Sequence, residues 1–236
     1  MNQRTRIKIC GLTRTEDVQA AVDAGADALG FVFYGASPRH VAPEAAARLI
    51  ARVPPFIATV GLFVNASVSE VVDTVAQAPV SLLQFHGDET PQQCAALAEA
   101  VNRPFIRAFR VKPETTAADL LQYESECRAA SGLFAGLLLD TYVDAYGGAG
   151  KVFDWSVIPK EFAPRVVLSG GLSVQNAAGA IARVCPFAVD ISSGVEQAKG
   201  IKDAGKIRDF IAAVRQADST RQTGARPSGP IEEKTR

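Results

Sequence analysis

Ile7-Lys8-Ile9-Cys10-Gly11, near the start of the chain, has the alternation of a β-strand. Its two isoleucines fall on one face, which suits packing under helices, while the lysine and the cysteine fall on the other face, which suits an interior site. A capping-box pattern at Thr13 and Glu16, followed by apolar residues at helical spacing, predicts a helix next. The chain therefore begins with a strand followed by a helix.

The same order of strand and helix recurs along the chain. Further strands are predicted over 27–33, 56–64, 81–85, 105–110, 134–140, 166–169 and 187–191. Helices are predicted over 44–52, 67–77, from 90, 116–127, 173–183 and 203–216, with a weakly helical connection after the sixth strand. Parallel strands joined by helical crossovers favour a closed α/β barrel, the (β/α)8 or TIM barrel of typically ~250 residues. An open doubly wound sheet is the alternative, but no GxGxxG sequence follows the first strand.

The chain is predicted to form one domain with a tail. Residues 1–217 make the barrel. From 218 to 236 the sequence is polar, rich in proline and glycine, and without apolar periodicity. These features predict a disordered tail.

Composition excludes several classes of function. The 25 basic and 25 acidic residues balance and are scattered, so no nucleic-acid partner is expected. The four cysteines form no CxxC pair, which argues against a metal site or a redox dithiol. The residues MNQRTRIKICG lack the apolar run of a signal peptide, and no stretch approaches ~20 apolar residues, so we expect a cytoplasmic protein that does not enter a membrane. We expect either a monomer or a homodimer.

Several reactive side chains follow predicted strands, where TIM barrels build their active sites. Cys10 ends the first strand, Arg39 follows the second, His86 follows the fourth and Asp140 ends the sixth. Arg39 could grip a substrate carboxylate with its two-pronged guanidinium, although a solvated surface arginine fits its spacing too. His86 is assigned a supporting role.

Glycine-rich turns follow the seventh and eighth strands, at Gly170-Gly171 and at Ser192-Ser193-Gly194. Glycine lets the backbone approach an anion closely, and free N–H groups donate to phosphate oxygens. Barrels often bind phosphate at these two strands. The turns therefore predict a phosphate site, with ordinary strand-end turns as the alternative.

A phosphate bound there would have Asp140 on one side and Cys10 on the other. Such a pair suits delivery of a proton by one group and removal of a proton by the other, each typically worth 10²–10⁴ in rate. Alternatively, Asp140 is a capping carboxylate and Cys10 a small buried residue or a nucleophile paired with a histidine. Lys8 would favour the Cys10 thiolate, but we expect Asp190 on the eighth strand to neutralise this lysine.

Seven motifs in order carry a resemblance to a known family: KICGL at 8–12, SPR at 37–39, QFHGDE at 84–89, LD at 139–140, GGAGKVFDW at 147–155, LSGGL at 168–172 and DISSGVE at 190–196. Together they resemble phosphoribosylanthranilate isomerase over about residues 6–216. Ala149 stands where that family often has threonine.

The resemblance implies a TIM barrel that needs no cofactor. Its reaction would be the Amadori rearrangement of N-(5-phosphoribosyl)anthranilate to 1-(2-carboxyphenylamino)-1-deoxyribulose 5-phosphate, the third step of tryptophan synthesis from chorismate. Asp140 would be the general acid and Cys10 the general base. Arg39 would lie near the anthranilate carboxylate, and Gly170, Gly171, Ser192, Ser193 and Gly194 would hold the phosphate.

Two other functions compete with this one. A histidine-pathway isomerase does the same chemistry on a substrate with two phosphates, but that family has an aspartate on strand one and needs a second phosphate site. No matching Gly-rich turns follow strands three and four here. A non-catalytic sugar-phosphate sensor is the other alternative, and the presence of both Cys10 and Asp140 argues against it.

Overall fold

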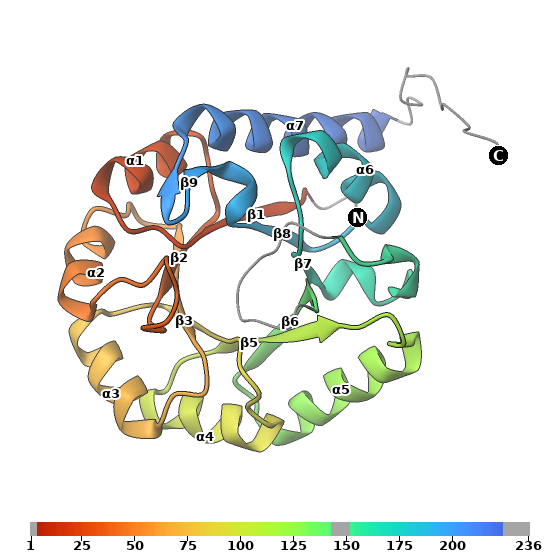
Figure 1. Ribbon diagram of the computed structural model, residues 1–236. Coiled ribbons are helices and arrows are strands. Elements are labelled where there is room, and N and C mark those ends of the chain that lie inside the picture. The colour runs from red at the N-terminus through yellow and green to blue at the C-terminus, as the bar shows by residue number, and fades with distance from the viewer. Residues whose placement is uncertain (1–3, 143–151, 224–236) are drawn as a thin grey trace.

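A computed structural model describes residues 4–142 and 152–223, and in it eight parallel strands close into a barrel in chain order, surrounded by helices (Figure 1). The closed TIM barrel predicted from the sequence is confirmed. The strands are β1 (Arg6–Cys10), β2 (Ala28–Val32), β3 (Ala58–Phe63), β4 (Leu82–Phe85), β5 (Phe105–Val111), β6 (Phe134–Thr141), β7 (Val167–Leu168) and β8 (Ala188–Ile191). The helices are α1 (Thr15–Asp23), α2 (Pro43–Ile50), α3 (Val68–Gln77), α4 (Pro91–Val101), α5 (Ala117–Ala130), α6 (Val174–Val184) and α7 (Ala204–Thr223).

Local sequence explains where three of the described helices begin. Ser67, Thr90 and Thr116 each close a capping box with the residue three positions later, at the starts of α3, α4 and α5. The box predicted at Thr13 and Glu16 is wrong. Helix α1 begins at Thr15 with no side-chain cap, because the Thr13 hydroxyl donates instead to the carbonyl of Gly200, 2.8 Å away.

The connection between β6 and β7 has no α-helix among its described residues. Two 3-10 turns, η1 (Trp155–Val157) and η2 (Ala163–Arg165), take that place, in agreement with the weak helical pattern. Asp154 caps η1 by accepting the backbone N–H of Ser156. The Gly-rich loop at 147–150, with Ala149, lies outside the described residues.

The last helix, α7, is longer than the sequence suggested. It continues to Thr223 rather than ending near 216. Asp218 is buried and accepts hydrogen bonds from the N–H of Thr5 at 2.6 Å and from its hydroxyl at 2.8 Å. Residues 218–223 thus continue the helix, and the Asp218 carboxylate holds the chain just before β1. Residues 224–236 of the predicted tail lie outside the described part of the chain.

The main core lies between the strands and the helices. Ile7 and Ile9 are fully buried in it, and a row of phenylalanine rings, each 5.6–6.4 Å from the next, runs around the barrel through β3, β4, β5 and β6. A smaller apolar cluster made by Ile106, Ala108, Leu138, Val167 and Ala188 is separate from it. As predicted, Lys8 and Cys10 lie on the opposite face of β1 from the isoleucines, one bonded to Asp190 and the other lining a pocket.

Candidate active site

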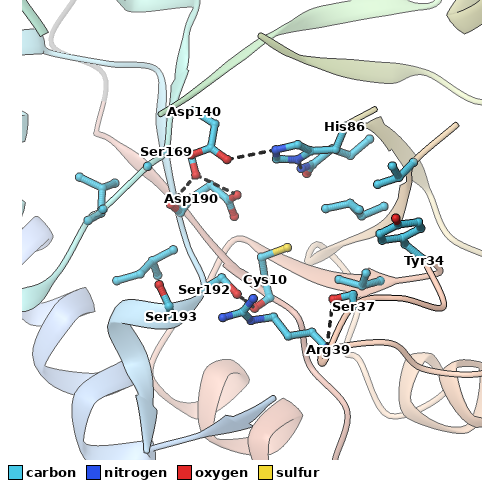
Figure 2. A pocket seen from close by; sticks show the side chains of 18 residues that line it. Cys10, Tyr34, Ser37, Arg39, His86, Asp140, Ser169, Asp190, Ser192 and Ser193 are labelled. Atoms are coloured by element: carbon cyan, nitrogen blue, oxygen red, sulfur yellow. Dashed lines mark hydrogen bonds and ion pairs between the residues drawn. The ribbon is translucent and has the colours of Figure 1, made fainter. Parts of the chain in front are cut away.

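A pocket opens at the carboxyl ends of the strands (Figure 2). Of the nine site residues predicted from the sequence, all but Gly194 line it: Cys10, Arg39, His86, Asp140, Gly170, Gly171, Ser192 and Ser193. Gly194 packs behind them, where a Cβ would lie 2.2 Å from the carbonyl of Leu172. Its lack of a side chain thus lets the turn after β8 approach the turn after β7.

Lys8 and Asp190 form the ion pair predicted from strand alternation. They are register partners on β1 and β8, and the Lys8 Nζ lies 2.8 Å from the Asp190 Oδ1, with both side chains buried. Burial lowers the pKa of Lys8, but Asp190 and Cys10 more than compensate and raise it above its ordinary value. The pair is therefore a neutral unit within the barrel.

Cys10 is 5% exposed at the floor of the pocket. Burial raises the pKa of its thiol, and the ammonium group of Lys8 offsets part of this rise. Gly30 is the register partner of Cys10 on β2, and a Cβ there would lie 2.8 Å from the sulfur. Our sequence interpretation missed this glycine. A residue without a side chain on the strand next to the cysteine would have indicated that the thiol needs space there.

Asp140 is held by two hydrogen bonds. Its Oδ2 lies 3.0 Å from the Nε2 of His86 (Figure 2). Its Oδ1 accepts the N–H of Thr141 at 2.8 Å. The Gln84 amide nitrogen lies 2.9 Å from the other ring nitrogen of His86 and donates to it, so Nε2 carries the hydrogen and donates to Asp140. His86, for which we expected a supporting role, therefore bonds to Asp140. The sequence interpretation did not identify Gln84 as the partner of His86.

Arg39 is paired with a carboxylate of this chain. Its Nε and Nη2 donate to the two oxygens of Glu196 at 2.7 and 2.9 Å, and its stem packs on Gly11, where a Cβ would lie 2.6 Å from the Arg39 Cδ. Glu196 begins β9 (Glu196–Ala198), which pairs with β10 (Ile201–Lys202) in a small antiparallel sheet that the sequence did not predict. Among the described residues, Nη1 of Arg39 has no hydrogen-bond partner and is available to an anion.

The two predicted phosphate turns both reach the pocket. Gly170 and Gly171 have φ values of +80° and +65°, and a Cβ on Gly170 would lie 2.4 Å from the Thr141 hydroxyl. Across from this turn, the Ser192 hydroxyl donates to the carbonyl of Cys10 at 3.0 Å. The Ser192 bond ties the turn after β8 to the strand that carries Cys10, and the turn after β7 packs closely against Thr141, the residue after Asp140.

Within residues 4–142 and 152–223, no group of three or more His, Cys, Asp or Glu side chains could hold a metal ion. None of the described helices is long and apolar enough to cross a membrane.

Known proteins resemble this chain over most of its length. The family model for N-(5'phosphoribosyl)anthranilate (PRA) isomerase matches residues 7–213. N-(5'-phosphoribosyl)anthranilate isomerase of Herminiimonas arsenicoxydans is 70% identical over 94% of this chain and 98% of its own, and that of Ralstonia nicotianae is 53% identical over 92% and 95%.

Solved structures agree with the sequence relatives. Phosphoribosyl anthranilate isomerase from Thermotoga maritima superposes with a TM-score of 0.78 at 40% identity, over 90% of this chain and 99% of its own. An isomerase of the same name, in complex with reduced 1-(o-carboxyphenylamino)-1-deoxyribulose 5-phosphate, has a TM-score of 0.74 at 38% identity. That match also covers 90% of this chain and 99% of the other. With a family model spanning the barrel and relatives this similar, the chain belongs to the N-(5'-phosphoribosyl)anthranilate isomerase family.

Proposed function

We propose that Cys10 and Asp140 are the base and the acid in the isomerisation of N-(5'-phosphoribosyl)anthranilate that this family performs in tryptophan biosynthesis. One observation carries the assignment. Cys10 on β1 and Asp140 on β6 line one pocket, and the strands between them in the closed barrel, β7 and β8, end in the two glycine-containing turns. A sugar held by its phosphate at those turns has a thiol on one side and a carboxyl group on the other.

The reaction proceeds in three steps on this geometry. The carboxyl group of Asp140 gives its proton to the ring oxygen of the ribose, and the C1–oxygen bond breaks as the nitrogen lone pair forms an iminium. The thiolate of Cys10 then takes the proton from C2, and that electron pair forms the C1=C2 bond of an enolamine. Loss of the enol proton and protonation of C1 give the ketone. C1 is reduced and C2 oxidised within one molecule, so the balance needs no external oxidant.

The contacts around Asp140 fix its orientation in the pocket. His86 and Thr141 fix the carboxyl group from two sides, which keeps it aimed at one point in the pocket. The Oε1 of Gln84 is buried with no hydrogen-bond partner among the described residues, and Gln84 lines the pocket. This unpaired acceptor can take a hydrogen bond from a hydroxyl group of the bound sugar.

The wall opposite the phosphate turns favours this substrate over one with two phosphates. β3 faces β7 across the barrel, and Val32, Leu62 and Val64 line the pocket on the side of β2 and β3. These three apolar side chains accept an aromatic ring and offer no donors to a second phosphate. The Nη1 group of Arg39 would donate a hydrogen bond to the carboxylate of the anthranilate.

Purified protein tests the proposal when it is given both candidate substrates. We expect turnover of N-(5'-phosphoribosyl)anthranilate and none of the histidine-pathway ribonucleotide, together with growth of a tryptophan auxotroph that lacks only this step. The opposite preference would refute the assignment.

We also propose that the protein acts in the cytoplasm on a phosphorylated small molecule, as a monomer or a homodimer without metal or cofactor. Light scattering of the full chain distinguishes the two oligomeric states. Activity that survives exhaustive dialysis against a chelator supports a reaction without metal, and loss of activity restored by a metal ion would refute it.

A further inference from the structure

A buried lysine on β10 has no part in the mechanism above. The side chain of Lys202 is 0% exposed, and its Nζ contacts three oxygens: the carbonyl of Ser192 at 3.0 Å, the hydroxyl of Ser192 at 3.2 Å and Oε1 of Glu196 at 2.9 Å. Glu196 in turn holds Arg39. A continuous set of contacts therefore runs from the turn after β8 to the arginine after β2.

The hydrogen bonds fix the protonation state of Lys202. The Ser192 hydroxyl donates its one hydrogen to the carbonyl of Cys10, so toward Lys202 it can only accept. All three partners of the Nζ are then acceptors, which an ammonium with three N–H groups satisfies in full. Burial lowers the pKa of Lys202, and Glu196 opposes that effect.

The charges of the network formed by Ser192, Lys202, Glu196 and Arg39 do not cancel. Arg39 and Lys202 are cations that share one anion, Glu196. Lys8 is already balanced by Asp190. Against the rise that burial causes, both Lys8 and Lys202 lower the pKa of the Cys10 thiol. The charged and titratable groups of the pocket and of this network are Lys8 and Cys10 from β1, Tyr34 and Arg39 from the loop after β2, His86 from the loop after β4, Asp140 from β6, Asp190 from β8, Glu196 from β9 and Lys202 from β10.

We propose that Lys202 and Glu196 are positioning residues, which join the turn after β8 to Arg39 and whose charges set how readily Cys10 gives up its proton. The inference rests on the proposed function, in which Cys10 acts as thiolate. Lys202 places a positive charge on the Ser192 hydroxyl that donates to the Cys10 carbonyl, and Glu196 balances part of that charge while it holds the guanidinium of Arg39. The same network borders the predicted phosphate turn through Ser192.

Two substitutions separate this electrostatic role from a structural one, because they change the charge in opposite directions. Lys202→Met removes a cation and Glu196→Gln removes the anion. The pH dependence of Cys10 ionisation is measured without substrate, from the rate of alkylation by iodoacetamide, read at the Cys10 peptide by mass spectrometry. Thiolate absorbance relative to a Cys10→Ser protein gives a second measure. Lys199→Met is the matched control, an exposed lysine in the same hairpin.

We expect the midpoint of Cys10 ionisation to rise by about one pH unit in Lys202→Met and to fall by about one unit in Glu196→Gln, with Lys199→Met unchanged. Shifts in the same direction, or no shift, would overturn the proposal. If Lys202→Met does not fold by circular dichroism, Lys202→Gln replaces it with the same expectation. Since no substrate is present, this result is independent of whether Cys10→Ser abolishes turnover, which tests the base assignment itself.

Discussion

Substitution of Gly30 by alanine should displace the Cys10 thiol while the barrel still folds. A Cβ at this position would lie 2.8 Å from the Cys10 sulfur, 3.1 Å from the Cys10 Cα and 3.2 Å from the Cε of Lys8, whereas ordinary contacts begin at 3.4 Å. The sulfur must therefore move by about 0.6 Å or more. Because a displacement of about 1 Å can cost 10²-fold in rate, we expect kcat to fall by roughly ten- to a hundredfold. Crowding should also lower the free energy of unfolding by about 1–3 kcal/mol.

Steady-state kinetics at saturating substrate and urea unfolding measure these two effects separately. Gly132→Ala is the matched control, because a Cβ there meets nothing within 4 Å and Gly132 does not line the pocket. If Gly30→Ala kept wild-type kcat, or if Gly132→Ala lost as much, the argument that Gly30 makes room for the thiol would be wrong.

Three further predictions concern stability. Asp190→Asn leaves the buried ammonium of Lys8 unpaired and should cost about 3–5 kcal/mol in urea unfolding, much of which a Lys8→Met/Asp190→Leu protein should recover; equal loss in both would contradict the pairing. Burial raises the pKa of Asp27, but hydrogen bonds from Arg4 and the backbone outweigh this and lower it. Its contribution is therefore complete above its ordinary pKa and is lost as pH falls through the lower folded value, so wild type and Asp27→Asn should converge in stability in acid and differ at neutral pH. Finally, a chain cut after residue 217 loses the buried bonds of Asp218 and should be less stable by at least about 2 kcal/mol, whereas one cut after 223 should match the full chain.

Features encoded by neighbouring residues were predictable from the sequence. Strand alternation and helix-start patterns depend on residues within one or two turns, so the eight strands and the helices that follow Ser67, Thr90 and Thr116 were found. The pairing of Lys8 with Asp190 followed from placing both side chains inside adjacent strands of a closed barrel. The pocket residues followed from the rule that barrel sites form at the carboxyl ends of strands.

Contacts between distant loops were not predictable. Glu196 lies 157 positions from Arg39, and their meeting depends on how the segment after β8 folds back as the hairpin of β9 and β10. The cap expected at Thr13 failed for the same kind of reason, because its hydroxyl bonds to Gly200 in that same segment. Local patterns carry no information on which of two competing partners a side chain meets after folding.

The central claim is that Cys10 acts as the base and Asp140 as the acid, and one comparison tests it most directly. Turnover of N-(5'-phosphoribosyl)anthranilate and affinity for the reduced product analogue are measured for wild type, Cys10→Ser and Asp140→Asn. We predict that each substitution lowers kcat by about 10²–10⁴ or more while analogue affinity stays within a few-fold, because each removes a proton transfer and leaves the phosphate turns in place. Full turnover in either variant would remove that residue from the mechanism.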